Sequence, residues 1–326
     1  MTNKPLVTVI IPTYNRVDYI SRSINSVLNQ TYKNIELIVI DDGSTDHTAS
    51  VVSEFKNIKY VYKPNGRQAS ARNAGLALAK GSYIATLDSD DYWHSDFIEE
   101  CITQLLEFEL DLVFANTIIV NENGSEHASF DQADWSSKYY NSSEYLNLIW
   151  IHLNGQKARE IFTKTCPAPS SALVFNRNSI SHLWDEKLAV ADDWDFTLTL
   201  LVSKDCKIAF CKKPLWRKYI VGDNIYESLS SEAKTKIVIL NDLSYMLEKN
   251  KEKYSTYEKL NIKTLQIQET LVLSYNMLRH KNFINFAKLI ILSFKMSIPI
   301  TTKKLTKTIC SRIFFYGHFI KIKAEA

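Results

Sequence analysis

Short apolar runs alternate with longer amphipathic segments through the first 120 residues of the chain. Strand-like runs rich in β-branched residues lie at 6–11, 35–40, 58–62, 83–87 and 110–120. Segments with helical spacing lie between them, at 17–28, 67–78 and 95–108. Strands that alternate with helices of this length need crossover connections. The pattern therefore predicts an α/β fold with a mainly parallel central sheet flanked by helices.

The rest of the chain changes character twice. Residues 121–165 are rich in Asn, Ser and aromatic side chains and have weak periodicity, and a strand-like run and a helical segment follow at 171–175 and 193–202. From about residue 229 the pattern is helical only. A chain of 326 residues is long enough for one large and one smaller domain. We therefore expect a sheet-containing domain at 1–220 and a helical C-terminal extension at 221–326.

The formal net charge of +3 is distributed unevenly. Residues 279–326 contain ten Lys or Arg and one acid, whereas residues 1–278 contain 29 bases and 35 acids. Within the basic tail, the segment 288–323 mixes Leu, Ile and Phe with Lys. This suits a helix on an anionic membrane surface, and a packed helix pair with a solvated basic face explains it equally well. Nucleic acid is disfavoured as a partner because the remainder of the chain is not basic.

Several classes of protein are excluded by features that the sequence lacks. The cysteines Cys101, Cys166, Cys206, Cys211 and Cys310 are odd in number and form no CxxC pair, which disfavours a disulfide framework or a zinc site. The first residues have no signal-peptide pattern, and no stretch reaches 18 apolar residues. We therefore expect an intracellular protein without a membrane-spanning helix.

Polar side chains follow three of the predicted strands, which is where open α/β sheets bind their ligands. Thr13, Tyr14, Asn15 and Arg16 follow the first strand, Asp41 and Asp42 the second, and Asp88, Ser89, Asp90 and Asp91 the fourth. Five carboxylates at one sheet edge repel one another, and a divalent cation such as Mg²⁺ or Mn²⁺, completed by phosphate oxygens, relieves that repulsion. The preference of Asp for turns explains one such cluster well and two at the same edge less well.

A glycine-rich phosphate-binding motif is missing. Neither GxGxxG after a strand nor GxxxxGK[ST] occurs, so Rossmann dinucleotide binding and P-loop hydrolysis are disfavoured. Arg67 and Arg72 lie near the start of the Ala-rich segment 67–78 and can meet a diphosphate there. A solvated arginine on a helix face is the alternative interpretation of either residue.

Four motifs in order within about ninety residues resemble the family 2 glycosyltransferases. They read VTVIIPTYNR at 7–16, VIDDGSTD at 39–46, ARNAG at 71–75 and LDSDD at 87–91. The resemblance is strong over residues 5–120 and weaker to about 220. It implies the GT-A fold, a nucleotide-activated sugar as donor and a divalent metal ion, Mn²⁺ or Mg²⁺.

The resemblance also implies roles for individual residues. Thr13 and Asp41 match positions that hold the nucleotide base and ribose, and Arg72 matches the basic residue near the diphosphate. Asp88 and Asp90 match the acids of the DxD motif, the first meeting the ribose and the second the metal, and both are expected metal ligands. The expected nucleotide site also includes Tyr14, Asn15, Arg16, Asp42, Arg67 and Ser89, and Asp91 supports the acids beside it.

The sequence ADDWD at 191–195 resembles the acidic motif that starts a helix in this family, with Asp192 where Glu is usual. That alignment makes Asp193 the catalytic base and leaves open whether Asp192 acts instead. An inverting transfer needs one carboxylate to take the proton of the acceptor hydroxyl. We expect the helix dipole to depress the pKa of both acids, so that desolvation by Trp194 or the sugars is needed. Helix capping by these acids is the alternative.

Two other segments are candidates for acceptor binding. The aromatic segment 130–150 can stack on sugar rings, although a satellite core explains its irregular spacing better. The sequence PAPSS at 167–171 places Ser170 and Ser171 before a predicted strand. Their hydroxyls can donate to a sugar, and turn formation explains them equally well.

These features predict a metal-dependent inverting glycosyltransferase. It is expected to move a hexose or N-acetylhexosamine from a nucleotide sugar, UDP-linked by preference, to a hydroxyl of a glycan or lipid-linked glycan. The expected location is the cytoplasm, with peripheral attachment to the inner face of the plasma membrane. A sugar-nucleotide pyrophosphorylase is disfavoured because its glycine-rich basic loop is missing. A catalytically silent scaffold that recruits partners through the tail is the alternative from another class, and the intact acids argue against it.

Overall fold

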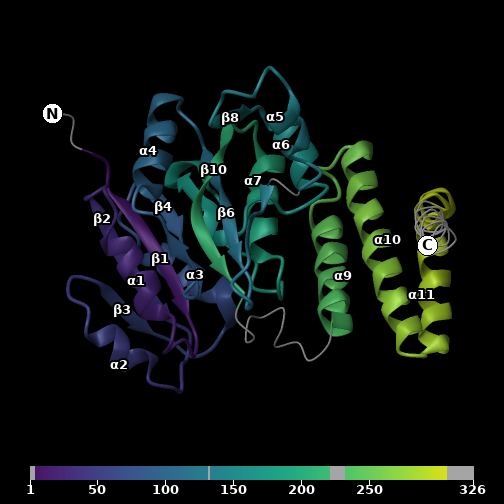
Figure 1. Cartoon of the computed structure of the whole chain (residues 1–326), viewed down its shortest axis with the longest axis horizontal. Coiled ribbons are helices and arrows are strands. Elements are labelled where there is room, and N and C mark those ends of the chain that lie inside the picture. Colours follow the sequence, from purple (N-terminus) through teal and green to yellow (C-terminus); the bar gives the residue numbers. More distant parts are fainter. Residues whose placement is uncertain (1–3, 131–132, 221–231, 307–326) are drawn as a thin grey trace, which may run out of the picture. The chain divides into compact units, whose positions relative to one another are not determined.

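The chain folds into two compact units, Met1–Ser228 and Leu229–Ala326. The computed structural model describes residues 4–130, 133–220 and 232–306. The sheet and its helices belong to the first unit, and the second unit is helical where it is described (Figure 1).

In the described part of the chain, ten strands form one sheet. Its main path runs in the order β3 (Lys59–Tyr62), β2 (Ile35–Asp41), β1 (Val7–Thr13), β4 (Tyr83–Thr86), β9 (Leu173–Asn176), β6 (Leu112–Val120), β10 (Ile208–Tyr219) and β5 (Tyr92–Trp93). Two short strands lie off this path, β7 (Glu126–Ala128) beside β6 and β8 (Trp150–Leu153) beside β10. The α/β class is confirmed.

Parallel pairing holds for the part of the sheet that the alternating pattern covers. β3, β2, β1 and β4 are all parallel, with Thr13 aligned to Asp41 at the ends of β1 and β2. Every residue of β1 is buried, as expected of a strand covered on both faces. The polar residues that follow these strands therefore emerge at one edge of the sheet.

The expectation of a mainly parallel sheet does not extend beyond β4. β10 is parallel to β6, whereas β9, β5, β7 and β8 each pair antiparallel with their neighbours. Antiparallel neighbours need only a tight turn or a short loop, and β6 and β7 are joined by one at Gly124, whose φ is +77°. The sheet is thus mixed, and the helices that flank it remain as predicted.

Helices pack against the sheet through small and apolar side chains. The helices of the first unit include α1 (Ile20–Leu28), α2 (Thr48–Ser53), α3 (Arg67–Leu78), α4 (Phe97–Glu107), α5 (Ser137–Asn141), α6 (Gly155–Phe162) and α7 (Asp192–Ser203). α3 lies on β1 and β2, and its Gly75 faces Ile10 so closely that an added Cβ would lie 2.4 Å from Ile10 Cγ2. This close approach brings the start of α3 to the ends of those strands.

The aromatic segment 130–150 packs largely within a core. The ring of Trp135 contacts Phe114, Phe130 and Phe210, and Tyr139 contacts Phe210. Tyr139 is buried, as are the three phenylalanines. These contacts favour the satellite core over a sugar-stacking surface for this part of the segment.

The second unit contains α9 (Glu232–Lys249), α10 (Thr256–Arg279) and α11 (Phe283–Met296), and residues 298–306 are also helical. α10 contacts both α9 and α11 (Figure 1). It begins with a capping box, in which the Ser255 hydroxyl accepts from the Glu258 N–H and the Glu258 carboxylate accepts from the Ser255 N–H. The predicted tail segment 288–323 lies outside the described residues from 307 onward.

Candidate active site

The ends of β1 and β2 hold one another through loop hydrogen bonds. The Asp42 N–H donates to the Thr13 carbonyl at 2.8 Å, and the Asn15 N–H donates to Ser44 Oγ at 2.9 Å. Asn15 has a φ of +50°, and its side-chain oxygen accepts from the Thr45 N–H at 2.8 Å. Asn15 therefore connects the loop after β1 to the loop after β2.

Asp41 and Thr13, which are predicted to bind the nucleotide, lie at the ends of these strands and differ in their hydrogen bonding. The Asp41 carboxylate is fully buried, accepting from the Ser44 N–H at 2.8 Å and from the Tyr60 hydroxyl at 2.7 Å. Thr13 is 3% exposed, and its hydroxyl has no hydrogen-bond partner among the described residues. An unpaired buried hydroxyl at a strand end fits a site that a polar ligand completes. Tyr14 is exposed beside it.

The side chains of Asp42 and Arg67 contact none of the other predicted site residues. Asp42 pairs with Lys63 at 2.6 Å and accepts from the Gly66 N–H at 3.0 Å, so it anchors the loop before α3. Arg67 is exposed at the first residue of α3, and its side chain forms no hydrogen bond or ion pair with the described residues. The structure does not bring Arg67 into contact with the acids.

Arg72 is the centre of the site. Its guanidinium is 1% exposed, and its Nη2 lies 2.8 Å from Asp88 Oδ1 while its Nη1 lies 2.5 Å from Asp192 Oδ2. Gln68, one turn earlier on α3, donates to the other oxygen of Asp192 at 2.6 Å. One buried arginine thus joins the motif after β4 to the acidic start of α7.

The acids after β4 differ in how open they are. The side chain of Asp88 is 30% exposed and that of Asp90 is 17% exposed, whereas Asp91 is buried. Arg16 lies 3.7 Å from Asp90, and Ser89 is buried between the two open acids. Burial and the charge of Asp88 raise the pKa of Asp90, and burial raises the pKa of Asp91 to about 8.

The open carboxylates fit a divalent cation. Asp88 and Asp90 each present oxygen atoms at the same turn, and Mg²⁺ or Mn²⁺ binds through one or two carboxylates together with phosphate oxygens. Among the described residues, no group of three or more His, Cys, Asp or Glu forms a metal cage. The donor set therefore suits an ion that arrives with a phosphate ligand.

Asp193 is held at the start of α7 by two backbone N–H groups. Its Oδ2 accepts from Ser170 at 3.1 Å, and its Oδ1 accepts from Trp194 at 2.7 Å. Burial and the charge of Asp192 raise the pKa of Asp193 to about 7, and burial also raises the pKa of Asp192. The expectation of depressed pKa values was wrong, because burial outweighs the helix dipole here.

The two serines before β9 turn toward the acids. The Ser171 hydroxyl donates to Asp91 Oδ2 at 2.5 Å and accepts from the Asp88 N–H at 3.0 Å. The Ser170 N–H binds Asp193, as described above, and its carbonyl accepts from the Thr86 hydroxyl at 2.7 Å. This turn therefore connects the acids after β4 to Asp193.

Lys218, near the end of β10, belongs to the same cluster and was not singled out from the sequence. The carboxylates of Asp91, Asp88, Asp90 and Asp193 raise its pKa against the opposing effect of burial. A lysine in the run KKPLWRKY is typical of a surface strand, so the sequence alone offers little signal for it. The antiparallel pairing of β10 with β5, which brings Lys218 to the acids after β4, cannot be read from the local sequence.

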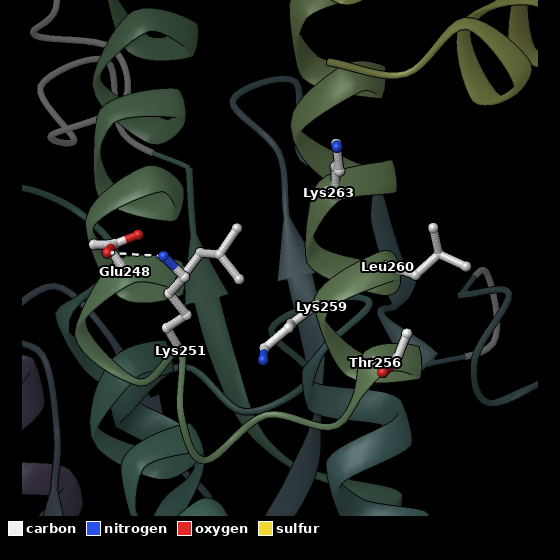
Figure 2. Close-up of a pocket in the computed structure, with 7 residues that line it drawn as sticks. Glu248, Lys251, Thr256, Lys259, Leu260 and Lys263 are labelled. Carbon is white, nitrogen blue, oxygen red and sulfur yellow. Dashed lines mark hydrogen bonds and ion pairs between the residues drawn. The ribbon is translucent and has the colours of Figure 1, made fainter.

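A separate cavity lies in the second unit, at the end of α9 and the start of α10. Its volume is about 320 Å³, and Figure 2 shows residues from both helices around it. The lining residues are Leu247, Glu248, Lys251, Thr256, Lys259, Leu260 and Lys263. None of the predicted site residues lies there, and the Glu248–Lys251 ion pair has an N–O distance of 3.4 Å.

Comparison with known proteins identifies the family. The model of the Glycosyl transferase family 2 matches residues 8–184, which is more than half of the chain and includes all the residues of β1 to β4 from Thr8 onward. The chain therefore belongs to this family and carries a family 2 glycosyltransferase domain.

Two of the curated relatives are bacterial synthases that are much longer than this chain. The chondroitin synthase of Pasteurella multocida (strain Pm70) is 32% identical over 78% of the chain and 24% of its own length. The hyaluronan synthase of Pasteurella multocida is 33% identical over 73% of the chain and 23% of its own length. The chain thus spans about a quarter of the length of these relatives.

Solved structures share the fold at low sequence identity. Staphylococcus aureus TarS 1–349, in complex with UDP-GlcNAc, has a TM-score of 0.54 and 18% identity over 87% of this chain and 90% of that one. A mannosyltransferase of Pyrobaculum calidifontis, in complex with GDP-Man and Mn²⁺, has a TM-score of 0.58 and 15% identity over 95% of this chain and 81% of that one. These likenesses confirm the GT-A fold.

Two other expectations concern what the described residues lack. No helix among them is long and apolar enough to cross a membrane. Cys101, Cys166, Cys206 and Cys211 are free, whereas Cys310 lies outside the described residues.

Proposed function

We propose that this protein transfers a hexose or N-acetylhexosamine, with inversion, from a UDP-linked sugar to a hydroxyl of a glycan or lipid-linked glycan. Residues 1–220 are proposed as the catalytic domain. Membership of family 2 supports the transferase class. The UDP-GlcNAc complex of TarS supports the type of donor, and the named products of the two synthases support a glycan acceptor.

The observation that carries the proposal is the position of Arg72. It binds Asp88 with one nitrogen and Asp192 with another. Asp193 is the residue directly after Asp192 in the chain. In this way the acids proposed for the donor and the acid proposed as base share one site. A transferase needs both functions within reach of one sugar ring.

Asp193 is the proposed base. Its carboxylate takes the proton of the acceptor hydroxyl while that oxygen attacks the anomeric carbon from the face opposite the diphosphate. The new glycosidic C–O bond forms as the bond from the anomeric carbon to the phosphate oxygen breaks, and UDP leaves with the bonding electrons. A pKa of about 7 suits this role, because the carboxylate is both available and basic near neutral pH.

Asp88 and Asp90 are the proposed holders of Mn²⁺ or Mg²⁺. The ion supplies charge neutralisation for the leaving diphosphate. Thr13 and Asp41 are proposed to hold the base and ribose, assisted by Tyr14, and Arg16 and Arg72 to keep the acids in place. Asn15, Asp42 and Ser89 shape the loops around them, and Arg67 is proposed to reach the diphosphate from the start of α3.

A thermal-shift screen of nucleotide sugars with and without Mn²⁺ tests the proposal. A donor present at about 100 times its Kd stabilises the folded protein by roughly 2.7 kcal/mol. We expect one UDP-sugar to raise the Tm in the presence of Mn²⁺ and this shift to be lost in Asp90→Ala. No shift with any nucleotide sugar, in folded protein, contradicts the proposal and favours a silent scaffold.

We also propose that α11 and the residues after it bind an anionic membrane surface on its cytoplasmic side. Residues 270–324 contain ten Lys or Arg and no Asp or Glu. Among the described residues from Phe283 onward, the exposed large apolar side chains are Phe283, Ile284, Ile291, Leu292 and Ile298. Apolar and cationic side chains on one segment suit an anionic lipid surface better than nucleic acid.

Sedimentation with liposomes tests the membrane proposal. We expect the protein to bind vesicles that contain phosphatidylglycerol, to ignore vesicles of phosphatidylcholine alone, and to lose binding when Ile284 and Ile291 are both changed to Asp. The control changes Leu146 and Leu148, which are exposed on the first unit, to Asp, and it should retain vesicle binding. Equal binding to both kinds of vesicle contradicts the proposal.

A further inference from the structure

Lys218 is a cation inside the acidic cluster, and the reaction proposed above gives it no role. It lies on β10, which pairs antiparallel with β5 so that Arg217 is aligned with Tyr92. Asp91 directly precedes Tyr92 in the chain. The register therefore places Lys218 beside the acids that follow β4.

The residue after Lys218 ties this end of β10 to the same turn. The Tyr219 ring stacks on the guanidinium of Arg22, with 3.6 Å between the Arg22 Cζ and the ring centroid. Arg22 in turn donates to the Asp90 carbonyl at 2.6 Å. Lys218 is thus fixed between two anchored neighbours, and its position next to the acids does not depend on its own side chain.

The surroundings of the ammonium are acidic and already contain other cations. Asp91, Asp88, Asp90 and Asp193 all attract it, with Asp91 the strongest. Asp88 also pairs with Arg72, and Asp90 lies near Arg16. An ammonium on a flexible four-carbon stem can leave one anion for another, unlike the buried planar fork of Arg72.

We propose that Lys218 binds the diphosphate of the nucleotide donor, so that the site holds UDP through a built-in ammonium as well as through a divalent ion. The inference rests on the proposed function. A diphosphate bound at Asp88 and Asp90 through an ion comes to the acids that surround Lys218. Lysine is a common phosphate ligand because its charge is compact and carries three donors. In the absence of the nucleotide, the same ammonium balances the acids.

Calorimetric titration of the 326-residue chain with UDP and with uridine tests this proposal, in EDTA and in Mn²⁺. We expect Lys218→Met to weaken UDP binding about tenfold or more in EDTA, since a hydrogen bond to a charged group is lost. Lys218→Arg should retain most of the affinity. Uridine has no phosphate, and its affinity should be the same in all variants. If Lys218→Met does not fold, Lys218→Gln takes its place, with folding checked by circular dichroism.

Lys213→Met is the matched control, because Lys213 lies on the same strand and pairs with Asp96 at 2.7 Å, away from the cluster. Unchanged UDP binding in Lys218→Met overturns the role of Lys218 and leaves the proposed transferase function in place. An equal loss for UDP and uridine also overturns it, because that result indicates a structural counter-ion. Failure of the unaltered protein to bind UDP with or without Mn²⁺ overturns the proposed UDP donor as well.

Discussion

Arg72 and Asp192 are 120 residues apart in the sequence and form a buried ion pair with an Nη1–Oδ2 distance of 2.5 Å. The same guanidinium binds Asp88, so the pair also joins the turn after β4 to α7. Both partners are almost inaccessible to solvent, and neither charge can be hydrated if the other is removed.

Removal of Arg72 is therefore expected to cost stability as well as activity. Arg72→Met leaves Asp192 buried without its cation, which should lower the free energy of unfolding by about 3–5 kcal/mol. Urea denaturation monitored by circular dichroism measures this. Arg72→Lys keeps the charge but cannot bind Asp88 and Asp192 at the same time in the same way. Its free energy of unfolding should therefore lie between those of the unaltered protein and Arg72→Met. A loss below about 0.5 kcal/mol in Arg72→Met would show that the pair is not buried as described.

Catalysis is expected to depend on pH through Asp193. Burial raises the pKa of this acid to about 7, and a base acts only when it is deprotonated. The rate of transfer should therefore rise with pH, reach half its maximum near pH 7 and level off above it. Initial rates at saturating donor between pH 5 and 9, corrected for metal binding, provide the profile. A rate that is already maximal at pH 5 contradicts the raised pKa.

Ser171 is expected to support the acids without contacting the substrate. Ser171→Ala leaves buried Asp91 and the Asp88 N–H without their partner, which should lower the stability by about 1–3 kcal/mol. Thermal and urea unfolding measure the loss. Ser137→Ala, at an exposed serine, is the control and should change stability by less than about 0.5 kcal/mol. A similar effect from both variants would show that Ser171 has no such role.

Close packing of α3 on β1 is expected to exclude any side chain at position 75. Gly75→Ala puts a Cβ 2.4 Å from Ile10 Cγ2, and such overpacking typically costs about 1–3 kcal/mol. In an Ile10→Ala background the contact is gone, so the same change should cost clearly less. The unfolding free energies of the unaltered protein, the two single variants and the double variant form a double-mutant cycle. Equal costs in both backgrounds would contradict the close approach.

Local patterns were sufficient to predict the first part of the fold. The helix at 67–78 has the predicted bounds, and the first two strands and the strand at 83–87 lie within about two residues of theirs. Each has a strong periodic signal and a clear end. The fold class and the acid clusters at the sheet edge follow from this half of the chain.

Long-range pairing accounts for what the sequence did not reveal. β10 contains Lys212, Lys213 and Pro214, which interrupt the strand pattern, and its register with β6 shifts at Pro214. The antiparallel position of β9 depends on neighbours far away in sequence. Lys218 could not be assigned to the acids without β10, and the raised pKa of Asp193 follows from burial that no local motif reports.

Comparison of Asp193→Asn with the unaltered protein tests the central claim most directly. UDP release from a UDP-sugar and UDP affinity are both measured in Mn²⁺, with Asp192→Asn as the second variant. We predict that Asp193→Asn slows transfer by about 10²–10⁴-fold and leaves UDP affinity within about threefold, because only the base is lost. Transfer at the normal rate in Asp193→Asn, or loss of catalysis in Asp192→Asn alone, would contradict the assignment of Asp193 as the base.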